Sequence, residues 1–371
     1  MKYLITLTPT GKFYFGGDNT FEVAGNDLYS KDTFGSYIVA SNCFPQQTSL
    51  LGMLRFLLLS NSDAFDKNLQ EITKSNKDKA KELIGQKSFH IGESNNFGKI
   101  ESIGTCFIRR GHENFFPAPK DFQLRVNFSQ ITDGKFNGAG RKIPTICYWD
   151  KKENKIEDYM AKFHSENLFV SENHTIKFDG IFIEDRRIGI DRDVKTGIVE
   201  DGALYKQISY RLRNGYCFAF TAEIADNYKF EQHNDSTVQI GGDNSNFLLN
   251  IEKIETGVDV KYKKKYEKLN DNLSDFHKVT LTANTFLAKD EIDFDFAIAE
   301  ILPFKFLQTS VNTTNYYITS KEVTKSDKFE LFANGSVFYF QSAEKMQKFK
   351  NSINKYEADF QKIGYNLFIN N

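Results

Sequence analysis

Residues 203–224 decide the fold class, and they read ALYKQISYRLRNGYCFAFTAEI. Two runs rich in aromatic and aliphatic residues flank the pair Asn214-Gly215, which accepts the positive φ angles of a tight type I′ turn. The segment therefore predicts a β-hairpin, with strands at 203–213 and 216–224. A strong hairpin among mixed strands and helices favours an α+β fold over a doubly wound parallel sheet.

The flanking sequence adds further strands and three helical regions. Residues 3–8 alternate apolar and polar side chains, as a strand does. Residues 50–59 are apolar on nearly every side and predict a buried helix, with Thr48 or Ser49 as its N-cap. We also expect short strands within 103–128 and near 237–240, 278–281 and 336–340, one or two surface helices within 63–85, and an amphipathic helix from Ala343 to about Phe360.

Composition limits the classes of function. The chain has 371 residues, is 40 % hydrophobic and 26 % charged, and carries a formal net charge of -1. This balance argues against bulk attraction to nucleic acid or to an anionic membrane, so any such binding must be local. The most apolar stretch is too short to cross a bilayer, and no signal peptide is evident. The four cysteines form no CxxC pair, so we expect buried thiols in a cytoplasmic protein.

Arginine usage is more informative than net charge. All 10 arginines lie between Arg55 and Arg213, and arginine offers a rigid fork that binds phosphate better than lysine does. Glycine, which lets backbone N–H groups reach phosphate oxygens, accompanies three basic clusters. The clusters are Arg109-Arg110-Gly111, Arg141-Lys142 in a glycine-rich loop predicted to be mobile (134–142), and 186–195. Each alone fits a solvated surface; together they favour single-stranded RNA as the ligand.

Known catalytic motifs are absent from the sequence. Gly241-Gly242-Asp243 is similar to metal-binding turns of polymerase palms, but Asn244 replaces the second acid, so we predict a plain tight turn whose glycines let another backbone approach. The histidines lack metal-ligand spacing, and no phosphate loop or nucleophile elbow occurs. We therefore predict no metal and no cofactor. His112, beside Arg109 and Arg110, is the one candidate for a general base in metal-independent RNA cleavage.

Five segments, taken in order, resemble the RAMP-superfamily subunit of type III-B CRISPR effector (Cmr) complexes, the third Cmr subunit type. They are Pro9–Lys12 with Phe15-Gly16, Phe44–Arg55, Phe116–Asp121, Arg187–Tyr205 and Gly335–Val337. The resemblance implies two ferredoxin-like, RRM-like domains with long inserted loops, expected over 1–215 and 216–371. It also implies a non-catalytic subunit that binds the 5′ handle of the CRISPR RNA and docks against the large polymerase-like subunit and a backbone RAMP subunit.

The expected path of the handle combines the basic clusters with that resemblance. Its residues would be Gln47, Thr48, Arg55, Arg109, Arg110, Arg141, Lys142, Arg187, Arg192, Gly241 and Gly242. The first three lie near a helix start, whose amides can meet a phosphate. The glycine-rich C-terminal loop usual in RAMP proteins is reduced to residues 364–366, where we expect little RNA contact. Two alternatives stay open: an endoribonuclease that processes precursor CRISPR RNA, and an assembly protein without RNA contact.

Overall fold

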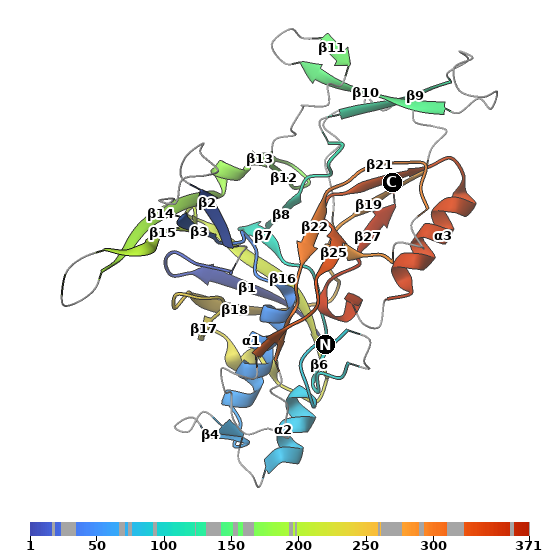
Figure 1. The fold of residues 1–371 in the computed structure, drawn as a ribbon. Helices are drawn as coiled ribbons and strands as arrows, with labels where there is room; N and C mark the ends of the chain where they lie inside the picture. Colours follow the sequence, from blue (N-terminus) through green and yellow to red (C-terminus); the bar gives the residue numbers. More distant parts are fainter. Residues whose placement is uncertain are drawn as a thin grey trace.

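The computed structural model of the chain combines antiparallel sheets with few helices, which confirms the expected α+β class (Figure 1). It describes residues 1–16, 19–23, 35–66, 71–72, 76–91, 95–122, 124–130, 142–150, 155–158, 167–192, 196, 199–258, 260, 277–288, 293–309, 323–356 and 360–370. For 19–23, 35–38, 71, 124–130, 142–150, 155–158, 190–192, 199–205, 307–309 and 323–325 the description covers the backbone alone.

The largest sheet has nine strands and the order β13-β12-β8-β7-β16-β1-β18-β17, with β6 also paired to β16. Its strands are β1 (Lys2–Pro9), β6 (Ile100–Ile103), β7 (Phe107–Arg110), β8 (Glu113–Pro117), β12 (Leu168–Val170), β13 (Thr175–Lys177), β16 (Tyr216–Ile224), β17 (Thr237–Gln239) and β18 (Asn246–Ile254). Alternate residues of β1, namely Tyr3, Ile5 and Leu7, are buried in the main core. The strand predicted at 3–8 is therefore confirmed.

Helix α1 (Gln47–Ser60) supplies much of that core, since Leu50, Leu51, Leu54 and Leu58 are fully buried. It begins earlier than predicted. The carbonyl of Gln46 accepts from the amides of residues 49 and 50, so Gln46 is the N-cap and its side chain makes no capping bond. The prediction of Thr48 or Ser49 as N-cap is therefore wrong.

The strands predicted around Asn214-Gly215 form, but their pairing is wrong. Strand β15 (Val199–Leu212) pairs with β14 (Phe182–Arg192) and β3 (Gly35–Ala40), whereas β16 pairs with β1, β6 and β7 in the large sheet. Gly215 has a φ of 85°, but Asn214 does not have a positive φ. A type I′ turn needs positive φ at both central residues to match the strand twist. The chain here passes from one sheet to another.

A turn with that backbone occurs instead at Asp243-Asn244, between β17 and β18. Both residues have a φ of 54°, and the Ser245 amide donates to the Gly242 carbonyl at 3.1 Å. Gly241 has a φ of 87°, and a Cβ there would lie 2.2 Å from the carbonyl oxygen of Tyr14. The predicted tight turn with close approach of another backbone is confirmed, and the approaching segment belongs to this chain.

A second sheet has the order β14-β15-β3-β2, where β2 is Asn19–Val23. Strands β14 and β15 extend from the body as an arm (Figure 1). Smaller sheets pair β9 (Leu124–Gln130), β10 (Lys142–Asp150) and β11 (Lys155–Asp158), β23 (Leu307–Thr309) with β24 (Val323–Lys325), and β4 (Phe65–Asp66) with β5 (Glu71–Ile72). Between residues 63 and 85 the described helix is α2 (Lys77–Ile84).

The C-terminal region contains two sheets, with orders β21-β26-β19-β27 and β20-β25-β22. The elements are β19 (His277–Leu281), β20 (Thr285–Phe286), β21 (Phe296–Ile298), β22 (Ile301–Phe304), β25 (Phe329–Phe332), β26 (Val337–Phe340), α3 (Ala343–Asn354), the 3-10 turn η6 (Gln361–Ile363) and β27 (Phe368–Asn370). The 3-10 turns η2 (Phe178–Gly180) and η3 (Phe230–His233) lie earlier in the chain. The strands predicted near 237–240, 278–281 and 336–340 are confirmed. Helix α3 ends at Asn354, earlier than expected.

The two regions share one core. Phe89 lies 5.6 Å from Phe306 and 5.7 Å from Phe360, measured between ring centroids, and all three belong to the main buried cluster. A boundary at residue 215 would separate β16 and β18 from β1, which lies between them in the sheet. No described helix is long and apolar enough to cross a membrane.

Two of the five motif segments meet at the joint between these regions. The Lys120 amide donates to the Gly335 carbonyl at 2.8 Å. Gly335 has a φ of 85°, and a Cβ there would lie 2.6 Å from the carbonyl oxygen of Ala118. Next to this contact, the Asp121 carboxylate accepts from Lys278 Nζ at 2.5 Å and from the Tyr339 hydroxyl at 2.6 Å.

Candidate nucleic-acid interface

Arg109 and Arg110 point to opposite faces of the large sheet, because successive side chains of a strand alternate. In register, Arg109 lies opposite Asn114 and Cys217, whereas Arg110 lies opposite Glu113 and Tyr216. The guanidinium of Arg109 donates to the Gly111 carbonyl at 2.8 Å and to Asn114 Oδ1 at 3.2 Å, and its side chain is 13 % exposed. Arg109 is therefore occupied within its own hairpin.

The Arg110 guanidinium lies over the ring of Tyr216, with Cζ 5.3 Å from the ring centroid and Nη1 3.4 Å from the hydroxyl. Tyr216 is itself buried. Among the described residues, Nε and Nη2 of Arg110 have no hydrogen-bond partner. Stacking thus holds a planar cation in place while leaving donors available for an anion.

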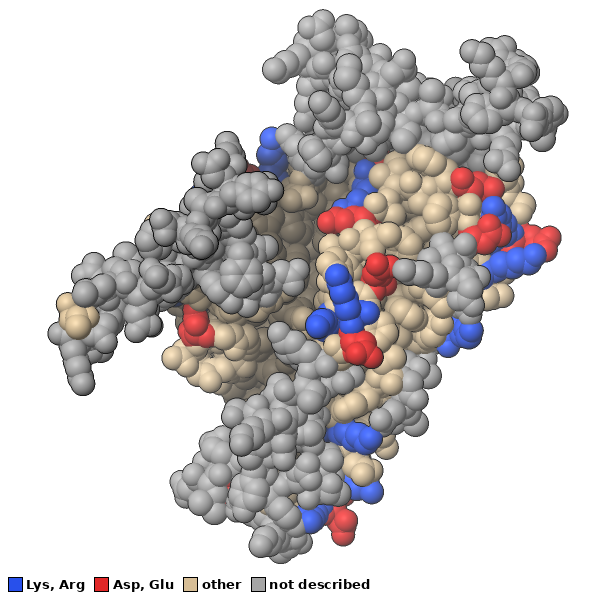
Figure 2. All heavy atoms as spheres, in the orientation of Figure 1, with Lys and Arg blue, Asp and Glu red and all other residues tan. Residues whose placement is uncertain are grey.

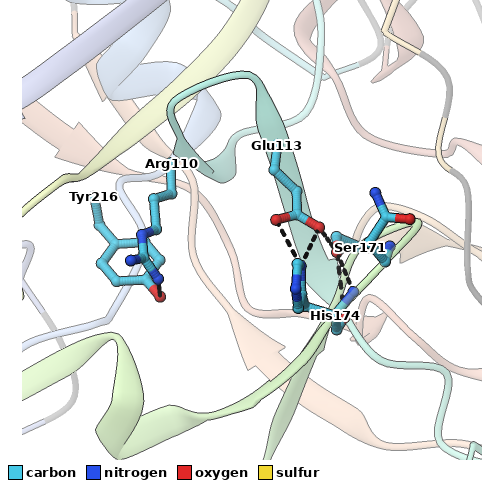
Figure 3. Close-up of polar contacts among 6 residues, drawn as sticks. Arg110, Glu113, Ser171, His174 and Tyr216 are labelled. Carbon is cyan, nitrogen blue, oxygen red and sulfur yellow. Dashed lines mark hydrogen bonds and ion pairs between the residues drawn. The ribbon is translucent and has the colours of Figure 1, made fainter.

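Beside Arg110, Glu113 holds a histidine from a distant segment (Figure 3). His174 Nδ1 lies 2.8 and 2.9 Å from the two carboxylate oxygens of Glu113, and the Ser171 hydroxyl also donates to that carboxylate. Burial raises the pKa of Glu113, but the hydrogen bonds from Ser171 and His174 outweigh it and hold the pKa below its ordinary value. Glu113 is therefore ionised at neutral pH.

This cluster differs from a Ser-His-acid triad. Ser171 Oγ donates to Glu113 and accepts the amides of His174 and Asn173 at 2.8 and 3.2 Å. In a triad the imidazole takes the proton of the serine, whereas here the serine bonds the carboxylate and caps its own turn. The cluster orients the His174 ring, whose side chain is 66 % exposed, and leaves Nε2 facing away from the carboxylate.

Sequence reasoning did not identify Glu113, Ser171 and His174. Glu113 and His174 are 61 residues apart, and pairing of β12 with β8 brings them together. No local motif signals a contact of that kind. His112, the histidine that the sequence favoured as a general base, lies exposed in the turn after Arg110 and has no hydrogen-bond partner among the described residues.

Three residues expected at the RNA path are buried inside the protein. Gln47 Nε2 donates to the carbonyls of Gly104 and Ile363 at 2.7 and 2.8 Å, and Thr48 is buried beside it. Arg55 Nε donates to the Ile84 carbonyl at 3.0 Å, and burial lowers the pKa of Arg55 to about 10. Gln47 and Arg55 thus join α1 to its neighbours, whereas the Thr48 hydroxyl donates to Gln46 Oε1 at the start of the helix.

The remaining predicted residues are dispersed. Arg187 lies on the arm with its side chain 61 % exposed and Nε 3.8 Å from Asp185, whose carboxylate also accepts from Arg211 at 2.6 Å. Arg192 ends β14, described as backbone alone. Arg141 and the glycine-rich loop before it lie outside the described residues, as does the side chain of Lys142. Gly241 and Gly242 accommodate Tyr14 of this chain. The described arginines therefore do not converge on one patch.

Figure 2 shows the same dispersal on one face of the molecule, where basic and acidic side chains alternate over the C-terminal sheets. A hollow separates those sheets from the arm, and its visible surface is mostly uncharged. On this face, local cations rather than a basic groove are therefore the feature available to a nucleic acid.

The cysteine side chains that the structure describes show no reactive site. Cys43, Cys106 and Cys217 are free thiols, and the side chain of Cys147 lies outside the described residues. Burial raises the pKa of Cys43 to about 12 and that of Cys217 to about 11, which keeps both protonated. Within the described ranges, no group of three or more His, Cys, Asp or Glu side chains is arranged to hold a metal ion.

Comparisons with known proteins identify the family. The model of the family described as CRISPR-associated protein (Cas_Cmr3) matches residues 5–370. A chain of the cryo-EM structure of the type III-B Cmr-beta bound to cognate target RNA is similar over 100 % of this chain and 96 % of that one, at 14 % identity and a TM-score of 0.51. A chain of the structure with target RNA and AMPPnP, state 1, has the same identity and coverage and a TM-score of 0.47. The comparison with curated proteins found no match.

Proposed function

The chain belongs to the Cas_Cmr3 family of CRISPR-associated proteins, and from that premise we propose that it is a non-catalytic structural subunit of a type III-B RNA-guided effector complex. The family match over residues 5–370 carries the proposal. The similar chain described above comes from a type III-B complex bound to target RNA. In this role the chain contacts the 5′ handle of the CRISPR RNA and docks against the large subunit and a backbone subunit.

Each half of the chain is proposed to be ferredoxin-like. In that fold a βαββαβ chain forms a sheet of order 4-1-3-2. Strands β1, β7, β16 and β18, with α1 after β1, have the spatial order β18-β1-β16-β7. Strands β19, β21, β26 and β27, with α3 before β27, have the order β27-β19-β26-β21. Both orders agree with the pattern, so we place the boundary between β18 and β19 instead of at residue 215.

Arg110 is the proposed RNA contact that the described structure supports best. Its guanidinium is exposed, stacked on Tyr216 and still offers free donors, which suits a phosphate or the face of a base. Arg187 on the arm, and Arg141, Lys142 and Arg192, remain proposed contacts. Gln47, Thr48 and Arg55 are proposed to shape the protein and not to touch RNA, since their polar groups are bonded inside it.

The test compares two adjacent arginines. Purified protein, alone and in the assembled complex, is titrated with handle-containing RNA at several salt concentrations. We expect Arg110→Ala to weaken binding and to reduce the salt slope by about 1. Arg109→Ala, on the opposite face, is the matched control and should leave the slope unchanged. Absence of binding by the wild-type protein, together with absence of crosslinks from the handle to this chain, would overturn the RNA-contacting role.

The same preparation tests the enzymatic alternative. Incubation with repeat RNA in EDTA should give no cleavage. Cleavage that His112→Ala abolishes would replace the structural role with that of a metal-independent endoribonuclease.

A further inference from the structure

The carboxylate of Glu113, the imidazole of His174 and the guanidinium of Arg110 lie at the end of the large sheet. Of these three groups, only Arg110 was predicted from the sequence to contact RNA. Arg110 and Glu113 are directly opposite in the β7–β8 pair, so their side chains leave the sheet on the same face. Figure 3 shows both side chains extending in the same direction, with His174 held against Glu113. Nε and Nη2 of Arg110 and Nε2 of His174 thus lie on the same face of the sheet, without a hydrogen-bond partner among the described residues.

Charge at this site depends on His174. With a neutral imidazole, the ionised Glu113 cancels the charge of Arg110, and the three groups together carry no net charge. Histidine is the side chain that gains a proton between pH 5 and 8. When His174 is protonated, Nδ1–H stays on Glu113, Nε2–H points outward, and the net charge of the site becomes +1.

We propose that Arg110 and His174 form a site that binds a phosphate group of RNA when His174 is protonated. Glu113 is the positioning residue, which holds the imidazole in place. This inference rests on the proposed function, because the phosphate is taken to belong to single-stranded RNA. Protonated His174 and Arg110 each donate a charge-assisted hydrogen bond to the phosphate. Bound phosphate in turn favours the protonated ring, so RNA affinity rises as the pH falls.

Other charges near the ring do not replace Glu113. Glu172 lies in the same turn and Lys177 on β13, and neither is bonded to the imidazole. Arg109 on β7 points to the other face. His112 in the β7–β8 turn lacks a carboxylate partner among the described residues, so it serves as a histidine control close to the site.

The test measures RNA affinity at two pH values and constant salt. Full-length protein is titrated with a labelled single-stranded RNA carrying the handle, and we expect binding about tenfold tighter at about pH 6 than at about pH 8. His174→Gln should remove most of that ratio by weakening binding at the lower pH. Glu113→Gln should tighten binding at the higher pH, because it removes the opposing charge. His112→Gln should retain the full ratio.

Different outcomes reject different statements. Wild-type binding with the same affinity at both pH values, or a pH ratio that His174→Gln leaves intact, overturns the proton-linked site and leaves the proposed function standing. No RNA binding at either pH overturns the proton-linked site, and, together with absence of crosslinks from the handle, also the RNA-contacting role. Binding of inorganic phosphate at millimolar concentration, without RNA binding, assigns the site to a free anion and also overturns the RNA site. If circular dichroism shows that Glu113→Gln is unfolded, the comparison of His174→Gln with His112→Gln still decides whether the pH ratio depends on His174.

Discussion

Replacing Asp121 by alanine should lower the free energy of unfolding more than removal of any exposed ion pair at the same joint. The Asp121 side chain is 10 % exposed and that of Lys278 19 %, so the pair is largely removed from water. Removing one partner of such a pair leaves a desolvated charge and costs about 3–5 kcal/mol. Tyr339 also loses the acceptor of its hydroxyl. Burial, and then the charge of Asp121, raises the pKa of Tyr339, so the phenol remains a donor. We expect a loss of about 4 kcal/mol.

Urea denaturation followed by circular dichroism measures this loss as a change in the free energy of unfolding. The matched control is Glu300→Ala, which removes a half-exposed partner of Lys120 at the same joint and should cost less than about 1 kcal/mol. The double variant with Lys278→Ala closes a mutant cycle with an expected coupling above about 1 kcal/mol. A cost for Asp121→Ala no larger than that of the control, with no coupling, would refute the reasoning.

Further predictions concern single residues. His233 is buried, and desolvation lowers its pKa. As the pH drops from about 7 to about 5, the unfolded state therefore binds more protons than the folded state, and the free energy of unfolding should fall. In urea titrations, His233→Gln should flatten that pH dependence. Gly364→Ala places a Cβ 2.2 Å from Gln47 Nε2 at a φ of 81° and should lower the melting temperature, with a cost of at least about 2 kcal/mol; an unchanged melting temperature would contradict it. Gly52→Ala meets nothing within 4 Å inside α1 and should stabilise by about 0.5–1 kcal/mol in the same assay. Arg55→Met should leave the salt slope of RNA binding unchanged, because the guanidinium is buried.

Local patterns predicted the elements better than their partners. The alternation in β1 and the apolar run of α1 are visible in the sequence because burial repeats with the period of each element. The pairing of β16 with β1 links residues more than 200 positions apart, and nothing local to Asn214-Gly215 reveals it. A type I′ turn requires a positive φ at Asn214. The long-range pairing of the two flanking strands, each in a different sheet, decided that φ.

In the candidate site, too, local features were visible in the sequence and long-range contacts were not. Arg109 and Arg110 were both predicted to line one RNA path, although alternation along a strand already implies that they point to opposite faces. The burial of Arg55 follows from its place in an apolar helix. The Glu113–His174 contact, by contrast, depends on β12 joining β8 after an intervening segment of some fifty residues, and no periodicity encodes that.

The common core of the two regions has a consequence for synthesis on the ribosome. Phe89 emerges early, yet the aromatic rings of Phe306 and Phe360 that cover it are translated more than 200 residues later. Until then the nascent chain exposes an apolar surface that is prone to aggregation. Two halves that are co-expressed as separate polypeptides would have to rebuild this interior by association. In the intact chain, dependence on chaperones should rise with every translational pause before the last hundred codons.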